Sequence, residues 1–334
     1  MKLYLNILKI SVLTYTSSIE DLPVLILAYN RFDKFNRCIN TLKDQGIKKV
    51  FISIDGPKNN FDLKNQDKIN EFCIQNPLNL DIKINKFQSN NGCRLGPIKG
   101  ITWFFNENKY GVVLEDDVLV SKKCMELFSF LLKDNFNKRN YMSISSFNEF
   151  TNKKIESIYS MPVWRSWAWA SWSNKWNEHL IFSKKIRHYS LFQLYKLMPL
   201  ELRSIETVKL VKASQLNLLD AWDYEFNFSH IVNNNSSLTM GGINSFVYGF
   251  DESSTHAVDI NSTGINFNLF SEREFDIKKI EYNIQNINSL TSNKCGFFFS
   301  DKKFFDLIFD LIKGIYFSLI FRLRIIKRNM YFRL

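Results

Sequence analysis

The stretch GVVLEDD at residues 111–117 decides how the sequence can fold. Its first four residues are a short apolar run with two β-branched valines, which predicts a buried β-strand. Three carboxylates follow without interruption, and a buried strand does not carry unpaired charges along its length. We therefore expect Glu115, Asp116 and Asp117 at the carboxyl end of the strand, the edge at which open α/β sheets bind their ligands. The alternative is a solvated turn rich in acids.

The residues before this stretch alternate between strand and helix patterns. Continuous apolar runs at 23–28 and 50–54 are typical of strands buried on both faces, and residues 81–86 alternate as a third strand. Between them, apolar residues recur at helical spacing over 33–46, and a polar helix fits 62–75. This order predicts an α/β fold with a mostly parallel, Rossmann-like sheet flanked by helices.

Polar residues follow the first two predicted strands. Tyr29, Asn30 and Arg31 come directly after the first strand, and Asp55 comes after the second. Because parallel strands end at the same edge of a sheet, these side chains should converge on the three acids. An aromatic ring can stack on a nucleotide base, and Asp55 can accept hydrogen bonds from a base or a ribose. The sequence therefore predicts a nucleotide site at this edge.

The segment NNGCRLG at residues 90–96 predicts a flexible turn that carries one fixed cation. Asn91 and Gly92 are candidates for contact with the nucleotide. Arg94 or Lys99 can pair with its phosphates, because both side chains are cationic hydrogen-bond donors.

Three acids in one place suit a hard divalent cation, Mg²⁺ or Mn²⁺, that also holds a diphosphate. We predict Asp117 as its principal ligand, with Asp116 or Glu115 beside it. His256 follows an acidic, hydroxyl-rich loop and is a candidate for completing the metal shell or contacting the diphosphate. A loop histidine with no part in binding is the alternative.

The composition narrows the class of protein. Hydrophobic residues make up 45% of the 334 residues, enough to bury a full core, and the formal net charge of +11 suggests an anionic partner. Neither the dinucleotide pattern G-x-G-x-x-G nor the P-loop pattern G-x-x-x-x-G-K-[ST] occurs. No uninterrupted apolar stretch reaches the roughly 18 residues of a transmembrane helix. Five scattered cysteines without C-x-x-C spacing indicate reduced thiols in a cytosolic setting.

Several segments together resemble a known family. PVLILAYNR, FISIDGPK, NNGCRLG and WFFNENKYGVVLEDDVLV are similar to the nucleotide-binding half of GT-A glycosyltransferases. In particular they resemble bacterial nucleotide-diphospho-sugar transferases with an E-D-D form of the D-x-D motif, related to the N-acetylglucosaminyltransferase I type. PVWRSWAWASWSNKW, AWDYEF and NSFVYGFDESSTHA resemble later motifs of this family, with Ser166 and Phe226 departing from its usual pattern. The resemblance runs from Pro23 to His256 and implies a GT-A fold.

The resemblance also implies an activity. It indicates a metal-dependent glycosyltransferase that moves a sugar from a nucleotide-diphosphate donor to a surface-glycan or lipid-linked acceptor, with inversion. Residues 220–232 predict a helix, on which Asp223 and Glu225 are candidates for the general base that such a transfer needs. The similarity of AWDYEF to the family's W-D-Y segment favours Asp223. The alternative is that both acids lie on a solvated helix face.

The residues between the acidic strand and this helix contain most of the tryptophans. A helix at 121–138 and a strand at 141–145 come first, and five of the seven tryptophans then fall between residues 164 and 176. These rings either fill a core or form a wall that packs against the apolar faces of a sugar.

The C-terminal residues differ in character from the rest. Residues 304–321 have an apolar face and precede clustered lysines and arginines, which matches an amphipathic helix lying on an anionic membrane surface. A helix docked on the protein's own core is the alternative. We divide the chain into a nucleotide-sugar-binding half at 22–120, an acceptor-binding half of the same domain at 121–260, and a linker and tail at 261–334.

These observations predict a cytoplasmic enzyme that is peripheral on the inner face of the membrane. Two other classes remain open. The positive charge and the aromatic residues would suit a nucleic-acid-binding protein, but the clustering of cations beside the apolar face of the tail argues against a nucleic-acid partner. The second alternative is a non-catalytic relative that binds a nucleotide or a sugar.

Overall fold

Strands and helices alternate through the first half of the chain, as the sequence predicts. The computed structural model describes residues 18–133, 141–146, 158–162, 164–233, 236–240, 245–247 and 285–286. The first seven elements are β1 (Val24–Ala28), α1 (Phe32–Asp44), β2 (Lys49–Ile54), α2 (Asn60–Gln75), β3 (Asp81–Lys86), α3 (Gly92–Glu107) and β4 (Tyr110–Glu115).

The elements after β4 are shorter and less regular. They are β5 (Val118–Val120), α4 (Lys122–Lys133), β6 (Tyr141–Ser145), β7 (Ile158–Met161), β8 (Trp169–Trp172), α5 (Ser173–Ile186), α6 (Leu191–Leu197), a 3₁₀ turn (Leu200–Leu202), α7 (Ile205–Gln215), α8 (Asp223–Val232), β9 (Ser236–Met240), β10 (Ser245–Val247) and β11 (Gln285–Asn286).

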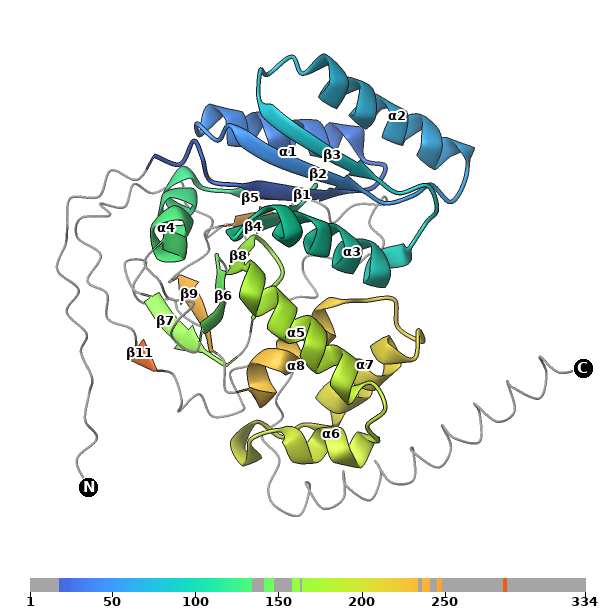
Figure 1. Ribbon diagram of the computed structural model, residues 1–334, viewed down its shortest axis with the longest axis vertical. Coiled ribbons are helices and arrows are strands. Elements are labelled where there is room, and N and C mark those ends of the chain that lie inside the picture. The colour runs from blue at the N-terminus through green and yellow to red at the C-terminus, as the bar shows by residue number, and fades with distance from the viewer. Residues whose placement is uncertain are drawn as a thin grey trace, which may run out of the picture.

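One mixed sheet runs through both parts of the chain, in the strand order β11-β7-β9-β6-β8-β4-β1-β2-β3 (Figure 1). Strands β3, β2, β1 and β4 are parallel, while β8 is antiparallel to both β4 and β6. Strands β5 and β10 form a separate antiparallel pair. The predicted α/β fold, a mostly parallel sheet flanked by helices, is confirmed. The predicted C-terminal amphipathic helix lies outside the described residues.

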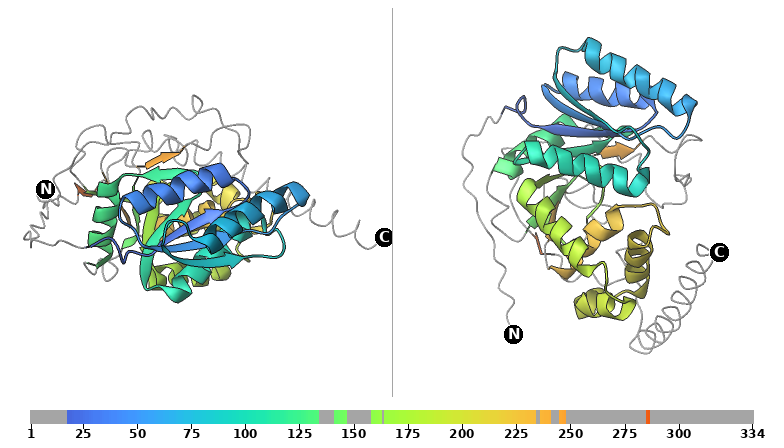
Figure 2. Two further views of the ribbon diagram at one scale, coloured as in Figure 1. Left: turned by 90° about the horizontal axis from the view of Figure 1, so that it is seen from above. Right: turned by 45° about the vertical axis from the view of Figure 1, so that its right-hand side comes forward.

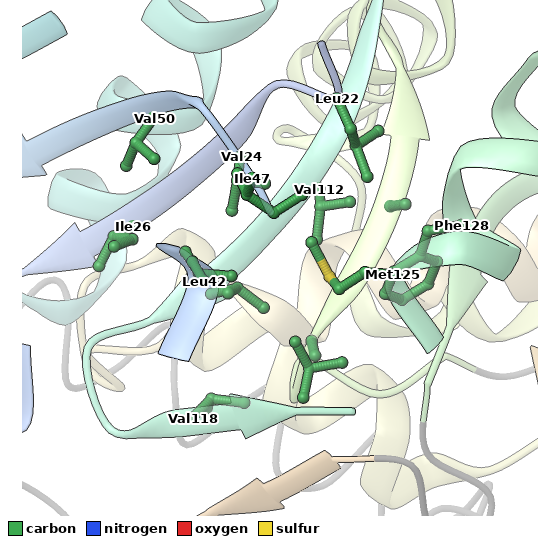
Figure 3. Close-up of a cluster of buried hydrophobic side chains, with 14 of the residues drawn as sticks. Leu22, Val24, Ile26, Leu42, Ile47, Val50, Val112, Val118, Met125 and Phe128 are labelled. Carbon is green, nitrogen blue, oxygen red and sulfur yellow. The ribbon is translucent and has the colours of Figure 1, made fainter. Parts of the chain in front are cut away.

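The apolar face of α1 fixes that helix on one side of the sheet. Phe35, Cys38, Ile39 and Leu42 recur at spacings of three and four, so they line one side of the helix, and all four are buried. The strand residues in the same core are Val24, Ile26, Val50, Ile52, Val112 and Leu114. Figure 3 shows part of this core, to which α4 contributes buried side chains from further along the chain.

The opposite face of the sheet carries a second core that is rich in aromatic rings. Phe51 of β2 and Val113 of β4 lie in it, because successive side chains of a strand alternate between the two faces. They pack with Phe104 of α3, Trp176 of α5 and Phe226 of α8. Figures 1 and 2 show α1 and α2 on one side of the sheet and α3 and α5 on the other. A third core joins α6 and α7 to the outer sides of α5 and α8.

Most of the clustered tryptophans belong to these cores. Trp164, Trp169, Trp172 and Trp176 are each at most 2% exposed, and Trp167 is half-buried. A ring with so little exposure cannot present a face to a sugar. The core interpretation is therefore confirmed for these four rings, and the interpretation of them as a sugar-binding wall is wrong.

The structure also corrects the predicted turn at 90–96. Helix α3 begins at Gly92, so most of this segment is helical. The local sequence favours a turn, but two distant carboxylates accept hydrogen bonds from the N–H groups at the start of the helix, as described below. Elsewhere, no helix of the described residues is long and apolar enough to cross a membrane.

Two histidines lie within the aromatic core. The His179 ring centroid is 4.9 Å from that of Phe226, and the His230 centroid is 4.7 Å from it. His230 shares hydrogen bonds with the Ser143 hydroxyl and the Phe226 carbonyl. Burial lowers the pKa of His179 to about 3 and that of His230 to about 4. Both rings are therefore neutral in the folded protein at pH 7.

We predict that these histidines make the protein acid-sensitive. In the unfolded chain a histidine has a pKa of about 6.5, so between that pH and the folded pKa the unfolded state binds more protons. The free energy of unfolding should therefore fall as pH drops below about 6.5, by up to about 1.4 kcal/mol per pH unit for each histidine. Urea unfolding of His179→Asn should show a shallower pH dependence between about pH 4.5 and about pH 6.5, a range that lies between the folded and the unfolded pKa of His179. The matched change His188→Asn, at an exposed position, should leave the slope unchanged. Equal slopes for all three proteins would contradict this account.

Candidate functional site

The three consecutive acids lie at the carboxyl end of β4, as predicted. Glu115 is the last residue of the strand, and Asp116 and Asp117 follow it. The Asp116 N–H donates to the Leu27 carbonyl of β1 at 3.0 Å, which continues the parallel ladder beyond the strand. Asp116 is 1% exposed and Asp117 is 6% exposed. Both carboxylates therefore need counter-charges or hydrogen-bond donors within the protein.

Arg31 supplies the counter-charge for two of these acids. Its guanidinium pairs with Asp117 Oδ2 at 2.7 Å and also with Asp116 Oδ1. Burial by itself would lower the pKa of Arg31, but the two carboxylates outweigh it and hold the pKa above its ordinary value. Arg31 therefore contacts the acids in the structure, whereas the sequence predicts that it contacts the nucleotide.

The acids remain in excess over this one arginine. Burial raises the pKa of Glu115 to about 8, with a further contribution from the Asp117 charge, while Arg31 opposes the shift. Burial also raises the pKa of Asp116 to about 6, again opposed by Arg31. The charge of Asp223, the first residue of α8, makes a smaller contribution in the same direction to the pKa of Glu115. A divalent cation would relieve this repulsion.

The donor set fits a divalent cation that is shared with a ligand. Asp117 Oδ1 is buried and has no hydrogen-bond partner in the described part of the chain, so it is available to a cation. No group of three His, Cys, Asp or Glu side chains among the described residues is arranged to hold a metal alone. Mg²⁺ commonly binds through one or two carboxylates together with substrate phosphates, and such a site needs no third protein ligand. The metal site stays a prediction, and His256 lies outside the described residues.

Asp62 fixes two of the predicted nucleotide-binding residues. It accepts hydrogen bonds from the Tyr29 hydroxyl and the Asn30 amide, both at 2.6 Å, and from the Lys58 N–H at 3.0 Å. The Asp62 N–H in turn donates to the side chain of Asn59, which caps α2. Sequence analysis missed Asp62. Its position three residues after a helix-capping asparagine was the available signal.

Asp55 is engaged with the start of α3. Its carboxylate accepts hydrogen bonds from the Asn91 and Gly92 N–H groups at 3.0 and 3.1 Å, and from the Asn91 amide at 2.7 Å. Lys99 donates to the side-chain oxygen of Asn91. These contacts bring Asp55, Asn91 and Gly92, all three of them candidates for contact with the nucleotide, together at the end of β2. Their contact with a nucleotide stays a prediction.

Asp220 is a second residue that the sequence analysis missed. Its carboxylate accepts hydrogen bonds from the Cys93 N–H at 3.0 Å and the Arg94 N–H at 2.7 Å. No local pattern signals this contact, because more than 120 residues separate the partners.

The structure corrects the role predicted for Arg94. Its guanidinium is buried and donates to Glu225 Oε1 at 2.7 Å, with further hydrogen bonds to Ser214 and Asn217. Glu225 also accepts a hydrogen bond from the Ser183 hydroxyl of α5. Since its donors are directed at these internal partners, Arg94 does not present a cation to a phosphate in this structure. Glu225 likewise holds a buried ion pair, which makes it a poor candidate for a general base.

Comparisons with known proteins give only distant similarities. No protein family matches the sequence, and no curated protein matches it. Among solved structures, two of HddC from Yersinia pseudotuberculosis, one complexed with GMP-PN, show 13% and 15% identity and a TM-score of 0.29. They cover 46% of this chain and 78% and 77% of HddC. The apo structure of the bifunctional glycosyltransferase WbbM has 10% identity and a TM-score of 0.35, covering 69% of this chain and 39% of WbbM. Similarities of this size carry no functional argument.

We predict that removing the arginine counter-charge destabilises the metal-free protein. Arg31→Gln leaves two buried carboxylates without their ion pair, and breaking a buried pair costs about 3–5 kcal/mol. Urea unfolding in EDTA should show this loss, whereas Arg37→Gln, at an exposed position on the same helix, should not. Mn²⁺ should raise the melting temperature of Arg31→Gln more than that of the wild type, because no arginine then competes for the acids. An Arg31→Gln variant as stable as wild type in EDTA would show that the ion pair is unimportant.

Proposed function

We propose that the protein is a metal-dependent glycosyltransferase that moves a sugar from a nucleotide-diphosphate donor to an acceptor hydroxyl. One observation carries this proposal. Asp116 and Asp117 pair with Arg31 at the ends of β1 and β4, Glu115 directly precedes them, and the Asp223 carboxylate of α8 adds to the raised pKa of Glu115. An excess of buried carboxylates beside a candidate base is the arrangement that metal-assisted displacement of a diphosphate requires.

The donor would bind across the carboxyl ends of β1, β2 and β4. Tyr29 offers a ring for the base, and its orientation is fixed by the hydrogen bond to Asp62. Asp55 offers a carboxylate near the start of α3 for the base or the ribose. Lys58 has its ammonium 6.0 Å from the Tyr29 ring centroid and adds a positive charge on this side of the site. These groups suit a nucleotide better than a free sugar.

Mg²⁺ or Mn²⁺ would be held by Asp117 through Oδ1, which has no hydrogen-bond partner among the described residues, with Asp116 or Glu115 beside it. When bound, the ion supplies positive charge that stabilises the departing diphosphate. Arg31 pairs with one oxygen of Asp116 and one oxygen of Asp117. It can also donate hydrogen bonds to phosphate oxygens.

Asp223 would act on the acceptor. Its carboxylate takes the proton from the acceptor hydroxyl while the oxygen forms a bond to the anomeric carbon of the donor. The bond from that carbon to the diphosphate oxygen breaks at the same time, and its electron pair leaves with the nucleoside diphosphate. A direct displacement of this kind inverts the configuration of the sugar. Inversion and a surface-glycan or lipid-linked acceptor are proposed from the family resemblance.

The membrane association is proposed from the sequence of the C-terminal residues. Their apolar face and clustered cations suit an anionic membrane surface, on the inner face of the cytoplasmic membrane. These residues lie outside the described part of the chain.

A second candidate is a non-catalytic relative that binds a nucleotide or a sugar without metal. The observation that favours it is the Arg31 ion pair, which occupies one oxygen of each of Asp116 and Asp117. Such a protein would bind a nucleoside diphosphate equally well in EDTA and in Mn²⁺, and would not turn over any donor.

We predict that nucleotide binding depends on metal and on Asp117. A thermal-shift screen of nucleotide sugars should find a donor whose stabilising effect is larger with Mn²⁺ than with EDTA, because binding raises the melting temperature by mass action. Asp117→Asn should remove the metal-dependent part of the shift while the protein stays folded. Asp44→Asn, at an exposed position, is the matched control. A donor shift that EDTA leaves unchanged would overturn the metal-dependent proposal and favour the second candidate.

We predict different effects for the two acids on α8. Asp223→Asn should cut turnover of the donor found in the screen by about 10²–10⁴-fold, the usual contribution of a general base, with donor affinity nearly unchanged. Glu225→Gln should instead lower the free energy of unfolding by about 3–5 kcal/mol, because it removes the partner of the buried Arg94. Turnover, calorimetric affinity and urea unfolding separate these outcomes. An active Asp223→Asn enzyme would place the base elsewhere.

A further inference from the structure

The start of α3 joins two distant parts of the chain through two carboxylates. The N–H groups of residues 91–94 point out of the beginning of the helix, where they have no partner within it. Asp55 accepts the first two at 3.0 and 3.1 Å, and Asp220 accepts the third and fourth at 3.0 and 2.7 Å. One acid comes from the end of β2 and the other from the segment before α8. The N–H groups of residues 91–94 therefore link the end of β2 to the segment before α8.

Gly92 provides the space for this contact. Its φ is +78°, a conformation that residues with side chains rarely adopt. A Cβ at this position would lie 2.7 Å from Asp220 Oδ2, too close for a non-bonded contact. The close approach of Asp220 to the helix thus depends on the absence of a side chain at residue 92.

A second contact ties the same helix to α8 on the other side of Asp223. Arg94 pairs with Glu225, two residues after Asp223, while Asp220 lies three residues before it. Between them, Trp222 is 5% exposed, and its ring centroid is 5.3 Å from that of Trp164. The residues around Asp223 are therefore held by α3 on both sides and by the aromatic core between.

We propose that Asp220 is a positioning residue, which fixes the first turn of α8, and so Asp223, relative to the nucleotide-binding ends of β1 and β2. The inference rests on the proposed function, in which the donor binds beside Asp55. A donor that orders Asp55 also orders the N–H groups of residues 91–94, because Asp55 accepts two of them. Asp220 accepts the other two, so donor binding reduces the motion of the first turn of α8. Asp220 itself touches neither the donor nor the acceptor.

Hydrogen–deuterium exchange with and without nucleotide tests this role. The probes are Mn²⁺ with UDP, GDP, CDP or ADP, each added to the full-length protein. In the wild type, the nucleotide that binds should slow exchange at residues 29–31 and 90–94 and also at residues 222–228. In Asp220→Ala, protection of 29–31 should persist, and that of 222–228 should be lost. Without nucleotide, the same change should speed exchange at residues 93 and 94, whose N–H groups lose their acceptor, by about tenfold or more, as expected when a helix-capping carboxylate is removed.

Three further proteins complete the experiment. Asp220→Asn keeps one acceptor oxygen and should retain part of the protection of residues 222–228 by nucleotide. If Asp220→Ala acted only through lost packing, the acceptor oxygen of Asp220→Asn would make no difference. Glu201→Ala, an exposed acid in the same region of the chain, should behave as wild type. Gly92→Ala should resemble Asp220→Ala, because the added Cβ displaces the carboxylate from the helix.

Two results would overturn the inference. In the first, nucleotide protects residues 222–228 equally in the wild type and in Asp220→Ala. In the second, nucleotide protects residues 29–31 but leaves 222–228 unchanged in the wild type, which would reject the coupling and leave the proposed donor site intact. If no nucleotide protects any of these residues, the proposed function fails and the positioning role fails with it. Faster exchange of residues 93 and 94 in nucleotide-free Asp220→Ala would then identify Asp220 as a structural cap of α3 only.

Discussion

The ion pairs between Arg31 and the acids after β4 set the geometry of the whole edge of the sheet. Asp116 and Asp117 are buried, and two neighbouring buried carboxylates need a counter-charge. Arg31 comes from the end of β1, so its pairing holds the ends of β1 and β4 together. Because β2 is the next parallel strand, Asp55 is brought to the same edge. The need of the acids after β4 for a counter-charge therefore fixes the edge of the sheet at which the proposed ligand site lies.

The single positive charge of Arg31 does not balance the three acids at the end of β4. Burial, with a further contribution from the neighbouring acids, raises the pKa of Glu115 and that of Asp116, and Asp117 has one oxygen without a hydrogen-bond partner among the described residues. A bound cation would stabilise the acids in the same way as Arg31 does, and at a site that a diphosphate can share. The first half of the chain thus supplies the chemistry of the site, while α8 supplies the candidate base through the contacts at the start of α3.

The sequence predicts the parts of the fold that depend on local patterns. Strands β1, β2 and β3 follow from apolar runs or alternation, and α1 follows from its helical spacing of buried residues. Strands β7 and β9 escaped prediction because they are short and carry serines in place of an apolar alternation. Ser160 of β7 and Ser237 of β9 are buried, and Ser143 of β6 forms hydrogen bonds with Ser237 and His230. Where buried strand positions are polar, the sequence shows no alternation of apolar and polar residues by which the strand could be recognised.

The candidate site likewise has features that follow from local sequence patterns and features that do not. The convergence of strand ends was predictable, since it follows from the parallel order of the strands alone. The contacts of Asp62 with Tyr29 and Asn30, and those of Asp220 and Arg94, were not, because the partners lie between 32 and 131 residues apart in the sequence. The start of α3 is the clearest example. Its local sequence resembles a turn, and the helix begins there because Asp55 and Asp220 accept its unpaired N–H groups.

The central claim is that the acids after β4 bind a divalent cation together with a nucleoside diphosphate. The most direct test is a crystal grown with Mn²⁺ and the nucleotide that binds, examined by anomalous diffraction at the manganese absorption edge. The account predicts one strong peak within bonding distance of an Asp117 oxygen, with the nucleotide across the ends of β1 and β2. A nucleotide bound there without a metal peak, or a metal peak far from Asp117, would contradict it.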